Sequence, residues 1–377
     1  MASHRWSSRR SVCWFTLAAI VVLGLVWSAP GRVPVLRASG QPASAPLAAL
    51  APGVTLEGPF THANLSVYVV RGSTRDAREY ITLDEGLGAH TVAVREKTRA
   101  GQDRAEVNSL EIENRSDKWL FLQAGDIVKG GKQDRTIMTD LTLPPRSGPQ
   151  PIEAFCVEHG RWTPSASGLA FNDNPGIVAG TRLKMAIQSE KSQPRVWQEV
   201  ANAERRAVAA AGVAGAPPFA AETVALSPTG TYNAIAEDKT LSASRQAYVT
   251  ALLPRIRKHP DAIGMVIAIN GTVTSADVYA SPVLFQRLSG KLLDSYALEG
   301  VLARDASQPI AAPTRQQAVA FLSKPSAARA ASETVGTSMQ RSTRETDDVV
   351  LYEYGQISQA AGAKSSVAVV HQSYLKK

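Results

Sequence analysis

The sequence predicts an α+β fold in which an N-terminal antiparallel β module is followed by helices, a β-hairpin and short C-terminal strands, packed as one unit. Three observations predict it. Residues 56–162 hold short runs of β-branched and aromatic residues bounded by Gly, Asn, Asp or Ser, which is typical of strands joined by turns. Apolar residues at helical spacing follow in residues 163–377. Within that part, Asn270-Gly271 separates two β-prone runs and predicts a tight hairpin.

The strands expected in the β module are short. They cover residues 65–70, 90–95, 109–114, 119–122, 136–143 and 152–158. Between the last two runs, Pro144, Pro145 and Pro149 predict a loop, because proline fixes φ and cannot donate a ladder hydrogen bond.

The second part is expected to hold most of the helices. Residues 193–211 repeat apolar side chains on one helical face, and Ser192 is placed as the N-cap. Further helices are expected at 244–258, bent at Pro254, at 281–298 and near 314–322. Three late β-prone runs, at 333–341, 349–354 and 367–371, are expected to close the chain.

The N-terminal segment predicts export. Arg5, Arg9 and Arg10 precede an uncharged apolar run at 12–29, and a positive region followed by such a run is a secretion signal. The run is also long enough to span a bilayer. The protein is therefore expected to be exported, secreted if the segment is cleaved and otherwise anchored by one N-terminal transmembrane helix.

The expected organisation follows from these patterns. Residues 1–40 form a signal peptide or membrane anchor, residues 41–55 an Ala/Pro-rich spacer, and residues 56–377 a single α+β domain. Within that domain, residues 56–162 are β-rich and residues 163–377 are mixed.

The basic charge of the chain comes largely from its N-terminus. The formal net charge is +8, but residues 1–40 hold five Arg and no Asp or Glu, which leaves +3 for the rest. No Lys/Arg-rich block with interleaved aromatic residues remains, so nucleic acid is not an expected partner. Membrane contact is expected only through residues 12–29, if they are not cleaved.

Cysteine and histidine give little sign of catalysis or metal binding. Cys13 begins the apolar run, so Cys156 is alone in the exported part and cannot form an intrachain disulfide. Flanked by Phe155 and Val157, Cys156 is expected to be a buried small hydrophobe rather than a nucleophile. The six histidines show no H-x-x-x-H or H-x-H spacing, so no metal or other cofactor is predicted.

Two clusters of polar residues stand out, GGKQDRT at 130–136 and CVEHGRW at 156–162. The first is not a phosphate loop, because Gln133 follows Lys132 and a β-prone run comes next. Backbone N–H groups beside these basic side chains would still suit a carboxylate or phosphate. The candidate binding residues are Lys132, Gln133, Asp134, Arg135, Glu158, Arg161 and Trp162. The expected partner is an anionic small molecule or a protein.

Each cluster also has a structural interpretation, and the residue types favour it slightly. Asp134 and Arg135 would pair across strands. A buried pair of Glu158 and Arg161 would pin a corner between the β module and the helices.

The leading hypothesis for function is a non-enzymatic ligand-binding or interaction domain. The alternative is a hydrolase-like enzyme with a site around Cys156 or Glu158 and a base brought from elsewhere, such as His371. No Gly-x-Ser-x-Gly elbow supports that alternative, so whether the protein is an enzyme stays open.

The two clusters, together with Phe121-Leu122-x-x-Gly-Asp, resemble the ARG and Rhodanese-Phosphatase-superfamily-associated Protein domain, a bacterial family of uncharacterised function. The helix start at Gln193, the hairpin at 264–271 and the terminal Val-Val-His run are similar too. The likeness extends from about residue 56 to the C-terminus. It implies a shared fold and a periplasmic or cell-envelope destination, and it implies no reaction. The family pattern usually has Gln at the position of His159 and often Asn at the position of Asp134, which argues against catalysis by His159 or Asp134.

Overall fold

The computed structural model describes residues 53–98, 105–166, 168–173, 176–213, 227, 229–305, 311–358 and 366–377. All of them belong to one compact unit, Ala45–Lys377. The expected export segment and nearly all of the expected spacer lie outside the described residues. Within the described part, no helix is both long enough and apolar enough to cross a membrane.

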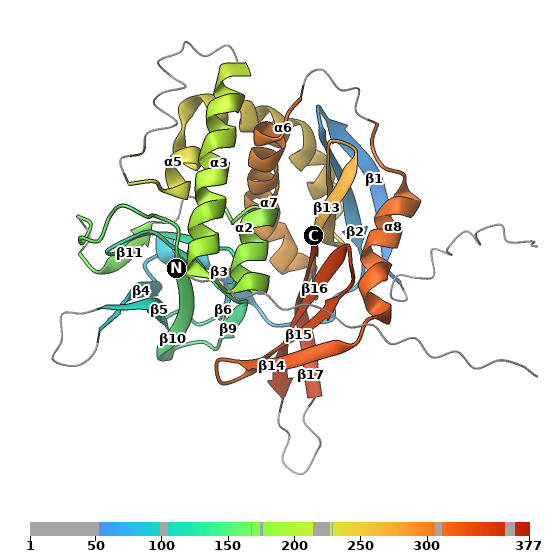
Figure 1. Cartoon of the computed structure of the whole chain (residues 1–377). Coiled ribbons are helices and arrows are strands. Elements are labelled where there is room, and N and C mark those ends of the chain that lie inside the picture. The colour runs from blue at the N-terminus through green and yellow to red at the C-terminus, as the bar shows by residue number, and fades with distance from the viewer. Residues whose placement is uncertain are drawn as a thin grey trace, which may run out of the picture. The chain divides into compact units, whose positions relative to one another are not determined.

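The largest sheet has eight antiparallel strands in the order β1-β2-β12-β13-β17-β16-β15-β14 (Figure 1). They are β1 (Thr55–His62), β2 (Leu65–Arg71), β12 (Ala262–Ile269), β13 (Thr272–Tyr279), β14 (Ala330–Val335), β15 (Met339–Glu345), β16 (Val349–Ser358) and β17 (Ser366–Lys376). The expected strand at 65–70 is β2, and together with β1, which was not expected, it joins strands of the second part. The α+β class is confirmed, but the expected order of a β module followed by a mixed part is wrong. The physical reason lies in β2, whose first six residues are all buried, so it needs a neighbour on each side. The equally buried β12 supplies one, with Met265 opposite Val69.

The rest of the expected β module builds two smaller sheets. A closed barrel runs β10-β5-β4-β11-β7-β8, and a three-stranded sheet runs β3-β6-β9. Their bounds are β3 (Tyr80–Thr82), β4 (Val92–Thr98), β5 (Ala105–Asn114), β6 (Trp119–Leu122), β7 (Ile127–Gly130), β8 (Arg135–Ile137), β9 (Leu141–Leu143), β10 (Ser147–Cys156) and β11 (Ala170–Asp173). The barrel recruits β11 from beyond residue 162, and β3 pairs with β6 in parallel, so this region is not antiparallel throughout.

Three expected strand boundaries are wrong. The run at 136–143 is divided between β8 and β9, because Asp140 turns inward and accepts a hydrogen bond from the Ala124 N–H at 2.8 Å. The expected loop at 144–149 is limited to residues 144–146, and residues 147–149 belong to β10, whose first part pairs only with β5. Its other edge needs no ladder donor, which is why Pro149 and Pro151 are tolerated. The run at 333–341 is a hairpin of β14 and β15.

The expected long helices are confirmed as α3 (Gln193–Val213), α6 (Lys239–Arg257) and α7 (Pro282–Leu302), and the short one as α8 (Arg315–Ser323). The Ser281 side chain caps α7 by accepting from the Leu284 N–H. Three short helices were not expected: α1 (Leu83–Gly88), α2 (Thr181–Met185), which continues into a π-helical turn at Ala186–Glu190, and α5 (Tyr232–Glu237).

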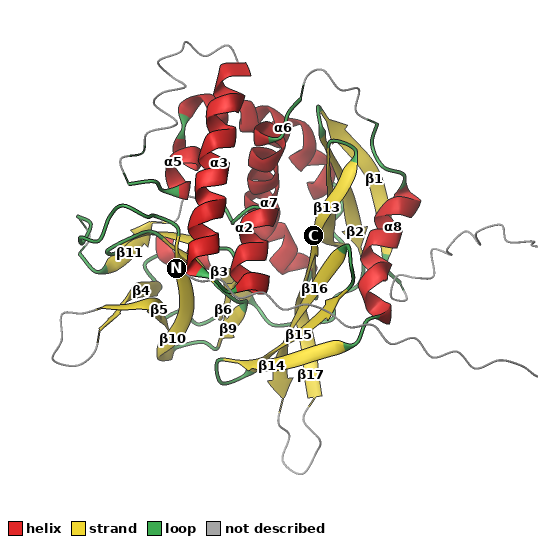
Figure 2. Ribbon diagram, in the orientation of Figure 1, coloured by secondary structure: helices red, strands yellow, loops and turns green. Residues whose placement is uncertain are grey.

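The large sheet has helices on both faces. Leu65, Val67 and Val69 of β2 pack into the core of α3, α6 and α7, whereas Tyr68 and Val70 pack into the core that includes α8. Figure 2 shows the sheet strands between the group of α3, α6 and α7 and the separate α8. This two-sided burial explains why the central strands are continuous apolar runs.

Candidate functional site

The GGKQDRT and CVEHGRW clusters converge, as the barrel pairs β8 with β10. The Arg135 guanidinium is fully buried and lies 3.1 Å from Glu96 Oε1, with neither side chain exposed. It also contacts the Cys156 Sγ at 2.6 Å and the Gln133 Oε1 at 3.2 Å. We call Glu96, Gln133, Arg135 and Cys156 the Arg135 cluster. Its cation is neutralised inside the protein and does not face solvent.

Gly131 of the Gly130-Gly131 pair allows the chain to pack closely against Glu96 and Phe171. Gly131 has φ +50, and a Cβ there would lie 2.8 Å from the Glu96 Oε1 and closer still to the Phe171 ring. Glycine is therefore required both for its conformation and for the close approach.

Glu158 and Arg161 pair at a neighbouring corner. The Glu158 Oε2 lies 2.6 Å from the Arg161 Nη2 and accepts from the Asp134 N–H at 2.9 Å. Arg161 also donates to the Gly131 carbonyl at 2.8 Å, which ties the glycine turn to the end of β10. The Asp134 Oδ2 accepts from Asn233 at 2.6 Å. These contacts match the structural interpretation of the cluster.

Only Trp162 of the seven candidate residues is strongly exposed, at 46%. The Lys132 Nζ and the Arg135 Cζ each lie 5.7 Å from the centre of its ring, within cation–π range. The structure thus brings all seven candidates together, while most of their charge is satisfied internally. A binding role for this surface stays a prediction.

Cys156 is buried, as expected. Burial raises the pKa of the Cys156 thiol, and Arg135 only partly offsets it, so the thiol resists ionisation. The base named in the hydrolase hypothesis is engaged elsewhere, because both ring nitrogens of His371 contact aspartates.

Those aspartates belong to a second buried cluster, which the sequence analysis did not find. His371 on β17 places its Nδ1 2.5 Å from the Asp140 Oδ2 and its Nε2 3.2 Å from the Asp277 Oδ1. The Lys184 Nζ of α2 lies 3.5 Å from the Asp277 Oδ2, and the Tyr296 hydroxyl of α7 donates to the same oxygen. We call these five residues the His371 cluster. No motif connects them, because they come from five separate parts of the chain.

The opposite charges in this cluster shift the pKa values of His371 and Asp277. Burial would lower the pKa of His371, but Asp140 and Asp277 outweigh it and raise the pKa to about 9. Burial would raise the pKa of Asp277, but Lys184 and His371 hold it well below its ordinary value. A protonated His371 and Lys184 thus balance two carboxylates in the interior, where an unpaired charge is costly.

The protein is expected to lose stability in mild alkali through His371. Its folded pKa of about 9 lies above the ordinary 6.5, so its contribution is fully present below pH 6.5 and is lost as the pH rises through 9. The free energy of unfolding is expected to fall by about 1.4 kcal/mol per pH unit, on the order of 3 kcal/mol in total. Urea unfolding between pH 6 and 8 measures the first part of this loss below the ordinary cysteine pKa of about 8.5. The exposed His90 gives the control variant His90→Gln, which should keep the slope. A flat profile in the wild type would contradict the assignment.

A cavity of about 680 Å³, separate from the clusters described above, is another candidate for a functional site. It is bounded by the start of α2, α5, one face of α3, the end of α7, the β12–β13 turn and the end of β17. Figure 1 shows the C-terminus beside α2, in agreement with the contact between α2 and β17. The α3 face consists of Arg195, Glu199, Ala203 and Arg206, which share one side of a helix. Its volume lies in the range of small-molecule sites.

Two arginines of this cavity lack a directly bonded counter-charge. Arg195 is paired with Glu190 at 2.5 Å, but over the described ranges the side chains of Arg182 and Arg206 make no ion pair and no hydrogen bond. Burial lowers the pKa of Arg206, and the neighbouring Arg182 lowers it further. We call this space the arginine cavity.

Glu299 also lines the cavity, but its carboxylate makes no ion pair with Arg182 or Arg206. Glu299 is held by Thr181, whose N–H and hydroxyl both donate to its carboxylate. Burial raises the pKa of Glu299 despite those bonds. The cavity therefore favours an anion close to Arg182 and Arg206. In the sequence, this site is visible only as Arg and Glu on one face of α3. Such a face looks like that of an ordinary solvent-exposed helix, so the sequence analysis did not identify the cavity.

No group of three or more His, Cys, Asp and Glu side chains suited to a metal ion occurs in the described part of the chain. Three sheets, helices on both faces of the largest sheet and a charged cavity define a large α+β domain. It holds a candidate small-molecule site together with the Arg135 and His371 clusters. Residues 53–375 match the family model of the ARG and Rhodanese-Phosphatase-superfamily-associated Protein domain, and the chain belongs to this family. No curated protein and no solved structure matches the chain.

Proposed function

We propose that this protein is a non-enzymatic binding domain for a small anionic molecule, which occupies the arginine cavity. The observation that carries the proposal is the pair Arg182 and Arg206, two neighbouring guanidiniums with no ion-pair partner among the described residues. Guanidinium groups bind carboxylates and phosphates through paired hydrogen bonds. An anion would also remove the repulsion between the two arginines. The N-terminal export signal, which stays a prediction, would place this binding in the periplasm or cell envelope.

The GGKQDRT and CVEHGRW surface is a second candidate binding site. The exposed ring of Trp162, with the Lys132 Nζ 5.7 Å from its centre, favours it. It ranks below the cavity because Arg135, Glu158 and Arg161 are satisfied by carboxylate partners or by the backbone.

Replacing Arg206 with Gln is expected to weaken anion binding at least tenfold, which is about 1.4 kcal/mol. The change removes one of two guanidiniums that would hold the ligand. Binding is measured by calorimetry and thermal shift of the full chain with inorganic phosphate, sulfate, succinate and glutarate.

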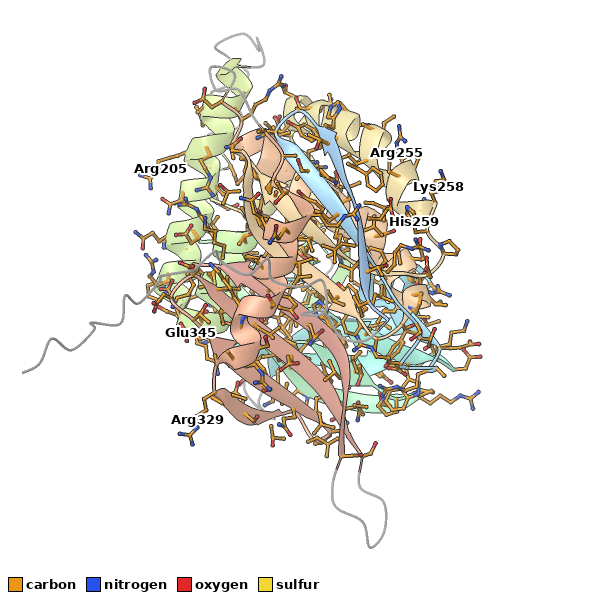
Figure 3. All side chains as sticks on the ribbon, turned by 90° about the vertical axis from the view of Figure 1, so that its right-hand side faces the viewer. Arg205, Arg255, Lys258, His259, Arg329 and Glu345 are labelled. Carbon is orange, nitrogen blue, oxygen red and sulfur yellow. The ribbon has the colours of Figure 1, made fainter. Side chains whose placement is uncertain are left out.

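The adjacent Arg205 provides a matched control for this experiment. It lies on the same helix, is exposed and projects outward from α3 in Figure 3. Arg205→Gln should bind every anion like the wild type. Equal losses in both variants would reveal a general charge effect and count against the cavity. Loss on Arg135→Ala, with no loss on Arg206→Gln, would favour the second site.

A further inference from the structure

The arginine cavity holds one more unsatisfied group, and it has the opposite charge. Glu199 lies on the α3 face of the cavity and is only 9% exposed. Its Oε1 accepts from the Asn202 side chain at 3.1 Å. Its Oε2 is buried and has no hydrogen-bond partner in the described residues. A buried carboxylate oxygen without a donor is costly, so a group that supplies one would be favoured.

Glu199 and Arg206 are seven residues apart on α3, which places them on one face about 10 Å apart along the axis. Their long side chains reduce that separation inside the cavity. An anion bound by Arg182 and Arg206 would neutralise those two arginines. Glu199 would then keep the attraction of Arg195, which is already paired with Glu190 at 2.5 Å. A cationic donor makes a stronger hydrogen bond to a carboxylate than a hydroxyl does.

The geometry points to a zwitterionic ligand, a small molecule that carries an ammonium group as well as its carboxylate or phosphate. The anionic group would lie against Arg182 and Arg206, and the ammonium would donate to the Glu199 carboxylate, which lines the same cavity. This inference rests on the proposed function, since it assumes that an anion occupies the same cavity. It adds an ammonium group to the anionic ligand of the proposed function.

Two matched series of compounds test the inference with the full chain. In the first series, succinate, L-malate and L-aspartate share a four-carbon dicarboxylate skeleton and differ in carrying hydrogen, hydroxyl or ammonium at one carbon. In the second, ethyl phosphate and phosphoethanolamine differ by a terminal ammonium. In at least one series the ammonium compound is expected to bind tenfold or more tightly than its partners, because one charge-assisted hydrogen bond is added.

Glu199→Gln is expected to abolish that preference while leaving the binding of succinate or ethyl phosphate equal or tighter. Glu79→Gln is the control, because the Glu79 side chain is 78% exposed and does not line the cavity. It should retain the preference. Unfolding midpoints of both variants verify that they are folded.

The outcomes separate the two proposals. Anion binding without any ammonium preference, a preference for L-malate, or a preference that survives Glu199→Gln would overturn the zwitterion inference and leave anion binding in place. Failure of every compound in both series, together with failure of the simple anions, would overturn the proposed function as well.

Discussion

Replacing Asp277 with Asn is expected to destabilise the protein by about 3–5 kcal/mol, the usual cost of breaking a buried ion pair by removing one partner. The substitution keeps the shape of the side chain but leaves the positive charge of Lys184 without its carboxylate. His371 would retain only Asp140. The result would be visible as a large shift in the midpoint of urea unfolding near pH 7.

A surface pair gives the comparison for this substitution. Asp261 pairs with Arg71 at 2.9 Å, with side chains 45% and 37% exposed. Asp261→Asn should therefore cost less than about 1 kcal/mol. The pH profile adds a second test, because Asp277→Asn should reduce the alkaline loss of stability by removing one of the two aspartates that raise the pKa of His371. If both substitutions cost the same, the His371 cluster is not the ionic core described above.

Glu96→Gln is expected to have a similarly large effect, about 3–5 kcal/mol, through the Arg135 cluster. The fully buried Arg135 would keep its charge and lose its only carboxylate partner in the described residues. Urea unfolding measures the effect. Glu111→Gln is the control, because its partner Arg95 is 45% exposed and the pair should contribute less than about 1 kcal/mol.

The double variant Glu96→Leu/Arg135→Met sharpens this prediction. Removing both charges leaves no unpaired ion, so most of the stability lost in Glu96→Gln should return. A double variant less stable than Glu96→Gln would show that Arg135 matters through its packing and its contact with Cys156 rather than through its charge.

Local patterns predicted the elements well where short-range chemistry determines them. The Asn270-Gly271 turn joins β12 and β13 as expected, and Ser281 caps α7. Partners distant in the sequence were not predictable in this way. The pairing of β2 with β12 joins Val69 to Met265, and a strand's sequence shows that it is buried but not by which neighbour.

The same limit applies to the candidate site. GGKQDRT and CVEHGRW were visible because each is contiguous, and their convergence follows from the pairing of β8 with β10. The arginine cavity draws its residues from several elements, and Arg182, Glu199 and Arg206 each look like ordinary surface residues in the sequence. What distinguishes them is a missing partner, which only three-dimensional contacts reveal.

The strand order of the large sheet also has a consequence for how the chain folds. All the barrel strands lie between Val92 and Asp173, so the barrel can form while later parts are still being synthesised. In the large sheet, β2 of the β1–β2 hairpin can pair with β12 only after that later strand has been synthesised. In the same way, β13 can pair with β17 only when the C-terminus is complete. Such distant pairings slow folding and expose strand edges in the meantime. We therefore expect an early barrel and a late sheet, with the C-terminal strand completing the fold.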